Sequence, residues 1–529
     1  MSNIATVIIL LAVVTALAEI TVRSKIPYPF LLVLEGIGIG VIPGLAVIRL
    51  SPDVVFLIFL PPILYQAAWT TSWPDFKAAK RPITLLAIGC VIFSTCAVAW
   101  IAHTFIPELG WPEAFVLGAI ISPPDAVAAA AATKGLNLPK RVTTILEGES
   151  LVNDATGLIA YRFALAAVIT GSFSLWEASY KFLIVAFGGI ALGLFLGFVF
   201  KWIHRLTPDN PTTDTTFTFI TPFIVFLFAE SIHVSGVLAL VACGLYISRY
   251  SSEIFSQQTR LQAYGTWETV IFILNGVIFI LIGLQLPKIW ESINDDIPAA
   301  TLLKYGVIVS AAVIIGRIIW VYPGTYVPRW LSKSIRQKET QTNMRLTTIV
   351  AWSGMRGVVS LAAALAIPLT INGVDRFPDR DLIIFLTFCV IFATLVLQGL
   401  TLRPLIRLLR IKADGREHEQ EEEVRLRMVS SIIEQIEENY SLNVNDEVLN
   451  LVKTKYEVRV QRLRRDPASQ RLTREQIEQY QNIQAELLAL ERNHLVALKK
   501  QSAVSDEILR KIEYELDLEE TRLMLERNR

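Results

Sequence analysis

The amino-acid sequence predicts an all-α polytopic membrane protein with about thirteen transmembrane helices, followed by a helical soluble tail. Of the 529 residues, 53% are hydrophobic and only 18% are charged, whereas soluble chains carry about 25% charged residues. Long apolar runs separated by short polar loops fill residues 1–410, and residues 411–529 contain no apolar run of membrane length. These observations predict a transmembrane domain over 1–410 and a tail domain over 411–529.

Thirteen apolar segments approach the roughly 20 residues that a helix needs to cross a bilayer. The first has no basic region before it and no small-residue cleavage site after it, so we interpret it as a span and not as a signal peptide. The third and ninth are short, and the eighth and ninth are separated only around His233. The segments lie near residues 4–22, 27–47, 53–69, 82–106, 112–132, 142–170, 178–203, 214–231, 234–248, 266–286, 300–322, 345–370 and 381–402.

The distribution of Lys and Arg in the loops predicts the orientation of these spans. Loops that follow odd-numbered spans carry seventeen of these residues, whereas loops that follow even-numbered spans carry four. Because loops rich in Lys and Arg remain in the cytoplasm, we expect the N-terminus outside and the C-terminal tail in the cytoplasm. The sequence thus predicts a multi-pass protein of the plasma (inner) membrane. No basic patch indicates nucleic-acid binding.

Ionisable and helix-breaking residues are concentrated in three spans. Span five contains Ser-Pro-Pro-Asp at 122–125, span six contains two glutamates and an Asn-Asp pair within 147–154, and span twelve contains Gly-Met-Arg-Gly at 354–357. An ionisable side chain at membrane depth costs at least about 2.5–3.5 kcal/mol on insertion scales, so it is a functional candidate by default. Further ionisable residues in or near spans, expected to line cavities, to form ion pairs or to be solvated at span ends, are Glu19, Glu35, Arg162, Glu230, His233 and Arg317.

Helical spacing separates the two carboxylates of span six that matter most. Glu149 and Asp154 are five residues apart, which places them roughly 140° apart around a helix, so they face different neighbours. Arg356 is the expected ion-pair partner of Glu149, because a guanidinium remains charged and binds a carboxylate through two hydrogen bonds. This assignment leaves Asp154 free to change its charge state. The opposite assignment, Arg356 with Asp154, remains open.

Spans five and twelve are expected to be broken helices. Pro123 and Pro124 remove two amide donors, and glycines flank Arg356. Broken backbone at membrane depth is tolerated where protein or a water-filled cavity meets the freed groups. If spans 1–6 and 8–13 form two inverted halves, both breaks fall in the fifth span of a half, where transporters place their ion site. We therefore predict crossed broken helices, although prolines and glycines in spans also serve packing.

Several motifs make the chain resemble the sodium/proton exchanger family, which comprises the eukaryotic sodium/hydrogen exchangers and their bacterial NhaP-type relatives. The Glu-Ser-x-x-Asn-Asp and Gly-x-Arg-Gly motifs are the most specific of them, and the resemblance covers essentially all of residues 1–410. The motifs are Phe-Leu-Pro-Pro-Ile-Leu at 59–64, the 122–127 segment, Gly-Glu-Ser-Leu-Val-Asn-Asp-Ala at 148–155, Ala-Glu-Ser-Ile-His-Val-Ser-Gly at 229–236, Gly-Met-Arg-Gly at 354–357 and Gln-Gly-Leu-Thr-Leu-Arg-Pro-Leu at 398–405.

The resemblance implies a homodimer in which a mobile core domain moves against a dimerisation domain. It implies that Asp154 binds the cation, most simply sodium, with help from Ser150 and the broken fifth span, and that Glu149 and Arg356 form a structural pair. Because Asn153 stands where some relatives have a second aspartate, it also implies electroneutral one-for-one exchange.

This chain departs from the family pattern at two positions. The family often has Thr-Asp-Pro in the fifth span, where this chain has Pro124-Asp125-Ala126, so Ser122 or a freed carbonyl has to replace the threonine ligand. The family also often has a carboxylate where this chain has Gln66. Both departures bear on which ion is selected.

We therefore predict a secondary active antiporter that exchanges sodium, or lithium or potassium, for protons by alternating access. Burial favours the neutral form of a carboxyl group, so Asp154 is expected to hold either a proton or a cation. Asp154, Ser150, Asn153, Asp125 and Ser122 form the predicted ion site. A cation channel is the alternative, but the sequence has no filter-like segment. Nothing indicates an enzyme or a cofactor.

The four cysteines, all in apolar stretches, are interpreted as small buried hydrophobic residues. The tail is predicted to be helical, with a capping-box pattern at 473–476. We expect it to regulate the protein or stabilise a dimer, although a passive extension remains open, and the sequence identifies no partner for it.

Overall fold

The structure, a computed structural model, describes residues 28–41, 55–411, 415–439, 474–500 and 506–527 and four isolated positions, apart from short gaps at 134–135, 137, 172–173, 207–209, 295–296, 339–342 and 372–374. The chain divides into two compact units, Met1–Ala413 and Asp414–Arg529. This division falls close to the domain boundary predicted after residue 410.

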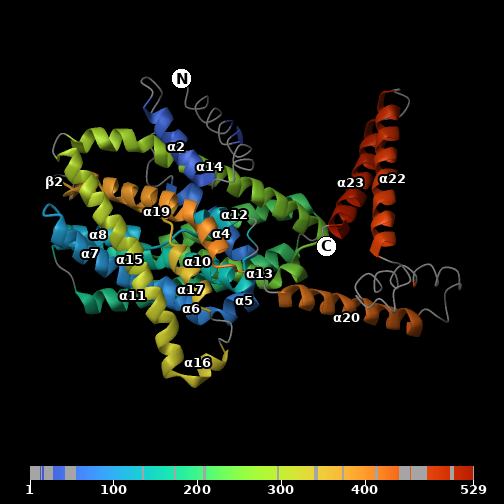
Figure 1. Cartoon of the computed structure of the whole chain (residues 1–529), viewed down its shortest axis with the longest axis horizontal. Helices are drawn as coiled ribbons and strands as arrows, with labels where there is room; N and C mark the ends of the chain where they lie inside the picture. Colours follow the sequence, from blue (N-terminus) through green and yellow to red (C-terminus); the bar gives the residue numbers. More distant parts are fainter. Residues whose placement is uncertain are drawn as a thin grey trace. The chain divides into compact units, whose positions relative to one another are not determined.

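The first unit is almost entirely helical (Figure 1). Two π-helical turns, η1 (Val55–Phe59) and η2 (Leu85–Cys90), and one two-residue antiparallel ladder, β1 (Thr370–Ile371) with β2 (Asp375–Arg376), interrupt the α-helices. The α-helices are α2 (Tyr28–Gly40), α4 (Leu60–Thr70), α5 (Trp73–Ala78), α6 (Lys80–Thr84), α7 (Val91–Phe105), α8 (Trp111–Ile121), α9 (Ala126–Thr133), α10 (Lys140–Thr170), α11 (Leu175–Arg205), α12 (Pro211–Ser231), α13 (Gly236–Ile254), α14 (Gln257–Asn294), α15 (Ala299–Leu331), α16 (Lys333–Lys338), α17 (Met344–Trp352), α18 (Val358–Leu365) and α19 (Arg380–Leu408).

From the second predicted span onward, the described part of each span contains one helix or consecutive helices. The first predicted span, near 4–22, lies almost wholly outside the described residues. Within the described part of the chain, seven helices are long and apolar enough to cross a membrane, and three further apolar helices have 10–17 residues. The unit is therefore a multi-pass helical membrane domain.

Spans five and twelve are each divided into two helices, as their prolines and glycines predict. Proline cannot donate an amide hydrogen bond and disfavours the helical conformation of the residue before it, so α8 stops before Pro123 and α9 starts only at Ala126. The two breaks lie against each other, because the amide of Asp125 donates to the carbonyl of Met355 at 2.7 Å. A Cβ on Gly357 would overlap the Asp125 carboxylate, so this close approach requires glycine.

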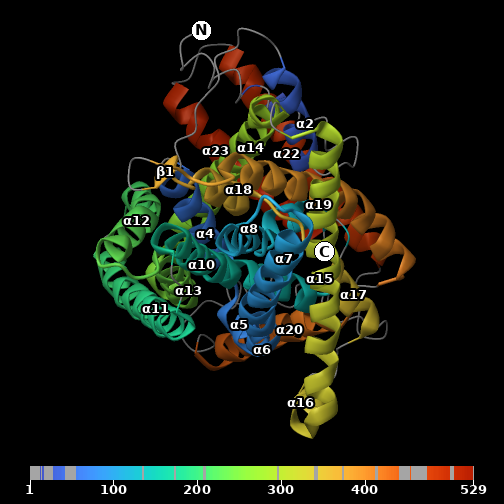
Figure 2. The same ribbon diagram turned by 90° about the vertical axis from the view of Figure 1, so that its left-hand side faces the viewer.

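Helix α10 packs against helices from many parts of the first unit (Figure 2). Its neighbours include α8 and α9 of the first broken span and α17 and α18 of the second. Both breaks are therefore held against the helix that carries the predicted carboxylates.

The second unit contains α20 (Gly415–Asn439), α22 (Arg474–Lys500) and α23 (Asp506–Arg527), of which α22 and α23 lie side by side (Figure 1). Arg492 of α22 joins them by donating to Asp517 and Glu520 of α23, each at 2.6 Å. Helix α22 begins one residue after Thr473, the first residue of the predicted capping box, which lies outside the described residues.

Candidate functional site

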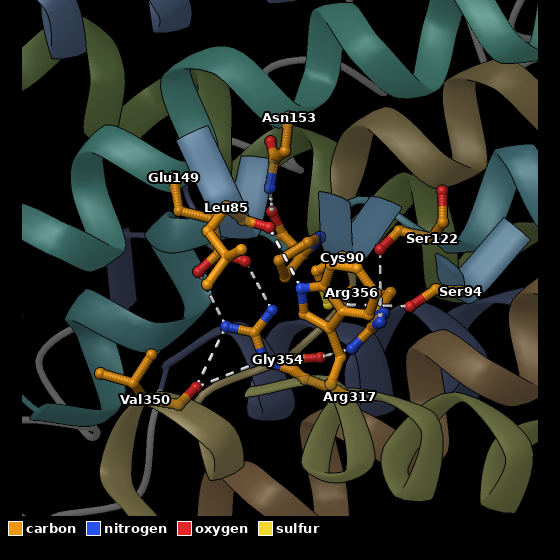
Figure 3. Close-up of polar contacts among 12 residues, drawn as sticks. Leu85, Cys90, Ser94, Ser122, Glu149, Asn153, Arg317, Val350, Gly354 and Arg356 are labelled. Carbon is orange, nitrogen blue, oxygen red and sulfur yellow. Dashed lines mark hydrogen bonds and ion pairs between the residues drawn. The ribbon is translucent and has the colours of Figure 1, made fainter. Parts of the chain in front are cut away.

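Glu149 forms a buried ion pair with Arg317 of α15. The side chains are 1% and 0% exposed. Nη1 and Nη2 of Arg317 donate to Oε1 and Oε2 of Glu149 at 2.5 and 2.8 Å. The same guanidinium also donates to the carbonyl of Val350, next to the second break, at 3.1 and 3.3 Å (Figure 3). A bidentate pair of this kind satisfies both charges and fixes their geometry, so Glu149 is a structural group.

The predicted pairing of Glu149 with Arg356 is therefore wrong, and the described residues show no contact of Arg356 with Asp154 either. Helical spacing showed which face of α10 carries Glu149, but it does not say which neighbouring helix lies across from that face. Arg317 had a signal of its own, as a cationic residue within the apolar span eleven.

Arg356 instead binds backbone carbonyls at the ends of the broken helices. Its guanidinium donates to the carbonyls of Ile121 at 3.0 Å, of Ser122 at 3.3 Å and of Gly354. The last carbonyls of a helix have no donor within the helix and carry partial negative charge. Arg356 thus compensates the C-terminal end of α8 and the carbonyl that follows α17.

Asp125 has the complementary role at the N-terminal ends of the other two half-helices. Its Oδ1 accepts from the amide of Val127 in α9 at 2.8 Å, and its Oδ2 accepts from the amide of Val358 in α18 at 3.4 Å. Helix N-termini carry partial positive charge and unpaired amides, which favour a carboxylate. Two helix ends therefore stabilise the negative charge of Asp125.

Asn153 and Ser122 form hydrogen bonds at the break between α8 and α9. Nδ2 of Asn153 donates to the carbonyl of Pro124 at 2.8 Å (Figure 3). The Ser122 hydroxyl accepts from Thr95 of α7 at 3.1 Å and donates to the carbonyl of Ala119 at 3.2 Å. Oδ1 of Asn153 is buried and has no hydrogen-bond partner among the described residues. Asn153 therefore keeps one oxygen for a ligand, whereas the Ser122 hydroxyl is engaged with protein groups.

Asp154 is the acidic residue of this region whose charge is not compensated. Its side chain is buried, with 5% of the residue exposed, and the structure gives its carboxylate no ion pair or hydrogen bond within the described residues. It lies close enough to Asp125 for the two charges to interact. Ser150, one helical turn earlier on α10, is half-buried. The site therefore combines one uncompensated carboxylate with nearby neutral oxygen atoms.

Comparisons with known proteins agree on one family. The family model described as "Sodium/hydrogen exchanger, transmembrane" matches residues 8–408. The sodium, potassium, lithium and rubidium/H(+) antiporter of Bacillus pumilus is 36% identical over 389 residues, which are 72% of this chain and 58% of that protein. The uncharacterized Na(+)/H(+) exchanger Mb2309 of Mycobacterium bovis is 31% identical over 528 residues, which are 98% of this chain and 96% of that protein.

A solved structure shows the same fold. The sodium proton antiporter MjNhaP1 from Methanocaldococcus jannaschii, at pH 8, matches with a TM-score of 0.61 at 20% identity, and the match covers 77% of this chain and 98% of that chain.

Proposed function

Because the chain belongs to the sodium/hydrogen exchanger family, we propose that it is a secondary active antiporter of the plasma membrane that exchanges a monovalent cation for a proton. Sodium is the first candidate cation, since the names of both relatives include it. Lithium and potassium are the alternatives, because the Bacillus pumilus relative is named for these ions as well. The oxygen atoms around Asp154 are hard ligands, the kind that such cations prefer.

The observation that supports this proposal most strongly is the uncompensated, buried carboxylate of Asp154. A bare carboxylate is costly to bury, so Asp154 is stable there when it binds a proton or a cation. Both forms are neutral and can move between the two sides of the membrane with the protein. The empty, charged form crosses poorly, and this difference couples the cation flux to the proton flux.

We further propose that the exchange is one-for-one. Glu149 is paired with Arg317, and Asp125 is balanced by the N-termini of α9 and α18. Asn153 carries an amide, which does not titrate. A single carboxylate therefore changes its occupancy, and it holds one proton or one monovalent cation.

The proposed cation ligands are the carboxylate of Asp154, Oδ1 of Asn153 and the hydroxyl of Ser150. The contacts of Asp125 and Ser122 favour a supporting role, in which they hold the broken helices in shape.

We propose thirteen spans in two inverted repeats, with the N-terminus outside, a cytoplasmic regulatory tail and a homodimer. The matching positions of the α8–α9 and α17–α18 breaks support the repeats. The channel alternative is disfavoured because both named relatives are exchangers.

Purified protein in proteoliposomes tests the exchange directly. With a pH-sensitive dye inside, addition of sodium, lithium or potassium outside should drive saturable proton efflux, and an imposed pH gradient should drive cation uptake. Cation flux that does not saturate and moves no protons would favour a channel instead.

A further inference from the structure

A cavity adjoins α10 beyond Asp154, toward the predicted outer side of the membrane. It has a volume of about 240 Å³ and is lined by residues of α10, α11, α12 and α13. Its polar lining includes Tyr161, Arg162, Glu230 and Ser235. The Tyr161 hydroxyl is buried and has no hydrogen-bond partner among the described residues. The cavity therefore brings polar groups of α10, α12 and the start of α13 together, on the helix that carries the ion site.

The spacing along α10 relates this cavity to Asp154. Leu158 and Arg162, which both line the cavity, are one and two helical turns beyond Asp154, so Arg162 is roughly 12 Å further along the helix axis. Asp154 lies near the middle of α10. Since the hydrocarbon core is about 30 Å thick, Arg162 lies near the outer boundary of that core. The cavity therefore lies beyond Asp154 along α10, where its lining residues run from Leu158 to Arg162.

An ion pair joins the two sides of the cavity. Nη2 of Arg162 contacts Oε2 of Glu230 at 2.7 Å. The other oxygen of Glu230 accepts from the amide of Gly236, at the start of α13, at 3.3 Å. Glu230 is therefore held by α12 and α13, whereas Arg162 belongs to the helix that carries Asp154. Any movement of α10 against α12 and α13 changes this contact.

The exposure of the pair distinguishes it from the Glu149–Arg317 pair. The Arg162 and Glu230 side chains are 55% and 29% exposed, whereas those of Arg317 and Glu149 are 0% and 1% exposed. Exposed ion pairs contribute little to stability, so this pair can open and close at a small cost. A contact that opens easily at the edge of this cavity suits a gate better than a structural bond.

We infer that Arg162 and Glu230 form the outer gate of the cation path, and that Glu230 is the first carboxylate that an entering cation meets. This inference rests on the proposed function. While the pair is closed, Arg162 neutralises Glu230 and repels cations. When α10 moves, Arg162 withdraws, and the Glu230 carboxylate attracts a cation into the cavity, from which the cation moves past Leu158 toward Asp154.

Thiol labelling at Leu158 tests this gate without requiring transport. Leu158→Cys places a thiol between the ion pair and Asp154, in a background in which the exposed Cys96 is replaced by serine. Intact cells and inverted vesicles are treated with a membrane-impermeant cationic thiosulfonate, so that each face is labelled separately. We expect slow labelling from outside, and acceleration by about fivefold when Arg162→Gln or Glu230→Gln removes the exposed pair. The double variant should label no faster than the faster single variant.

Lys181→Gln is the matched control, since it breaks an exposed i, i+4 pair with Glu177 on α11 that does not line the cavity. It should leave the labelling rate unchanged. Unchanged labelling in both Arg162→Gln and Glu230→Gln, or acceleration only from the cytoplasmic face, would overturn the gate. Labelling does not require transport, so the gate can be tested in an Asp154→Asn variant that does not exchange. Normal labelling of that variant would show that loss of exchange and loss of the gate are separate results.

Discussion

Arg317 binds both carboxylate oxygens of Glu149, and this contact leaves Asp154, five residues further along α10, without a cationic partner among the described residues. A second cation, Arg356, is equally buried but binds helix-end carbonyls. Glu149 is paired with Arg317, and Asp125 accepts hydrogen bonds from two helix N-termini. Of these three carboxylates, Asp154 is the one for which the described residues provide no such partner. This imbalance is the physical basis of the proposed exchange.

Removal of Arg317 should destabilise the protein strongly. Arg317→Ala leaves Glu149 buried and unpaired, which costs about 3–5 kcal/mol for a broken buried pair. The double variant Glu149→Ala with Arg317→Ala should be less damaging than the sum of the two single variants. Thermal unfolding in detergent, followed for all four proteins, measures this coupling.

The exposed pair of Lys181 and Glu177, 2.6 Å apart, provides the control for that cycle. Its coupling should lie within the range of about 0–1 kcal/mol that exposed pairs show. A cycle on Glu149 and Arg356 should be closer to additive than the cycle on Glu149 and Arg317. A larger coupling energy between Glu149 and Arg356 than between Glu149 and Arg317 would indicate that Arg356 is the partner of Glu149.

Local chemistry in the sequence predicted the breaks, but it did not predict the contacts across them. Proline and glycine change the conformation of the backbone at their own positions. The local sequence around Pro123, Pro124 and Arg356 is therefore enough to locate each break. The partner of Glu149 depends on which helix packs against α10, and that is a property of the whole bundle. For the same reason, the sequence did not reveal that Asp125 accepts from the amides of two half-helices.

Replacement of Gly357 by alanine should disrupt the crossing of the broken helices. The added Cβ would overlap the Asp125 carboxylate and displace it from the amides of α9 and α18, and overpacking of this kind costs about 1–3 kcal/mol. Gly357→Ala should therefore lower both thermal stability and exchange. Gly38→Ala in α2 is the control, because its Cβ meets no atom within 4 Å. If the two variants behave alike, Asp125 does not depend on that close approach.

Exchange should be insensitive to an imposed membrane potential. One titrating carboxylate carries either one proton or one monovalent cation, so each complete cycle moves no net charge. Proteoliposomes clamped with valinomycin at several potassium gradients measure this, and sodium-driven proton flux should be equal at every potential. Rates that change systematically with potential would show that Asp125 also titrates and that two protons move for each sodium ion.

The central claim is that Asp154 alone binds both transported ions, and sodium-driven proton flux through Asp154→Asn protein in proteoliposomes tests it most directly. Asp381→Asn makes the same chemical change at a side chain that is 57% exposed, and it should retain exchange at the wild-type level. Asp154→Asn should insert and unfold at a temperature close to that of the wild type, because no described ion pair or hydrogen bond is lost. Its proton flux should nevertheless fall to the level of empty liposomes. Substantial sodium-driven proton flux through folded Asp154→Asn protein would contradict the account.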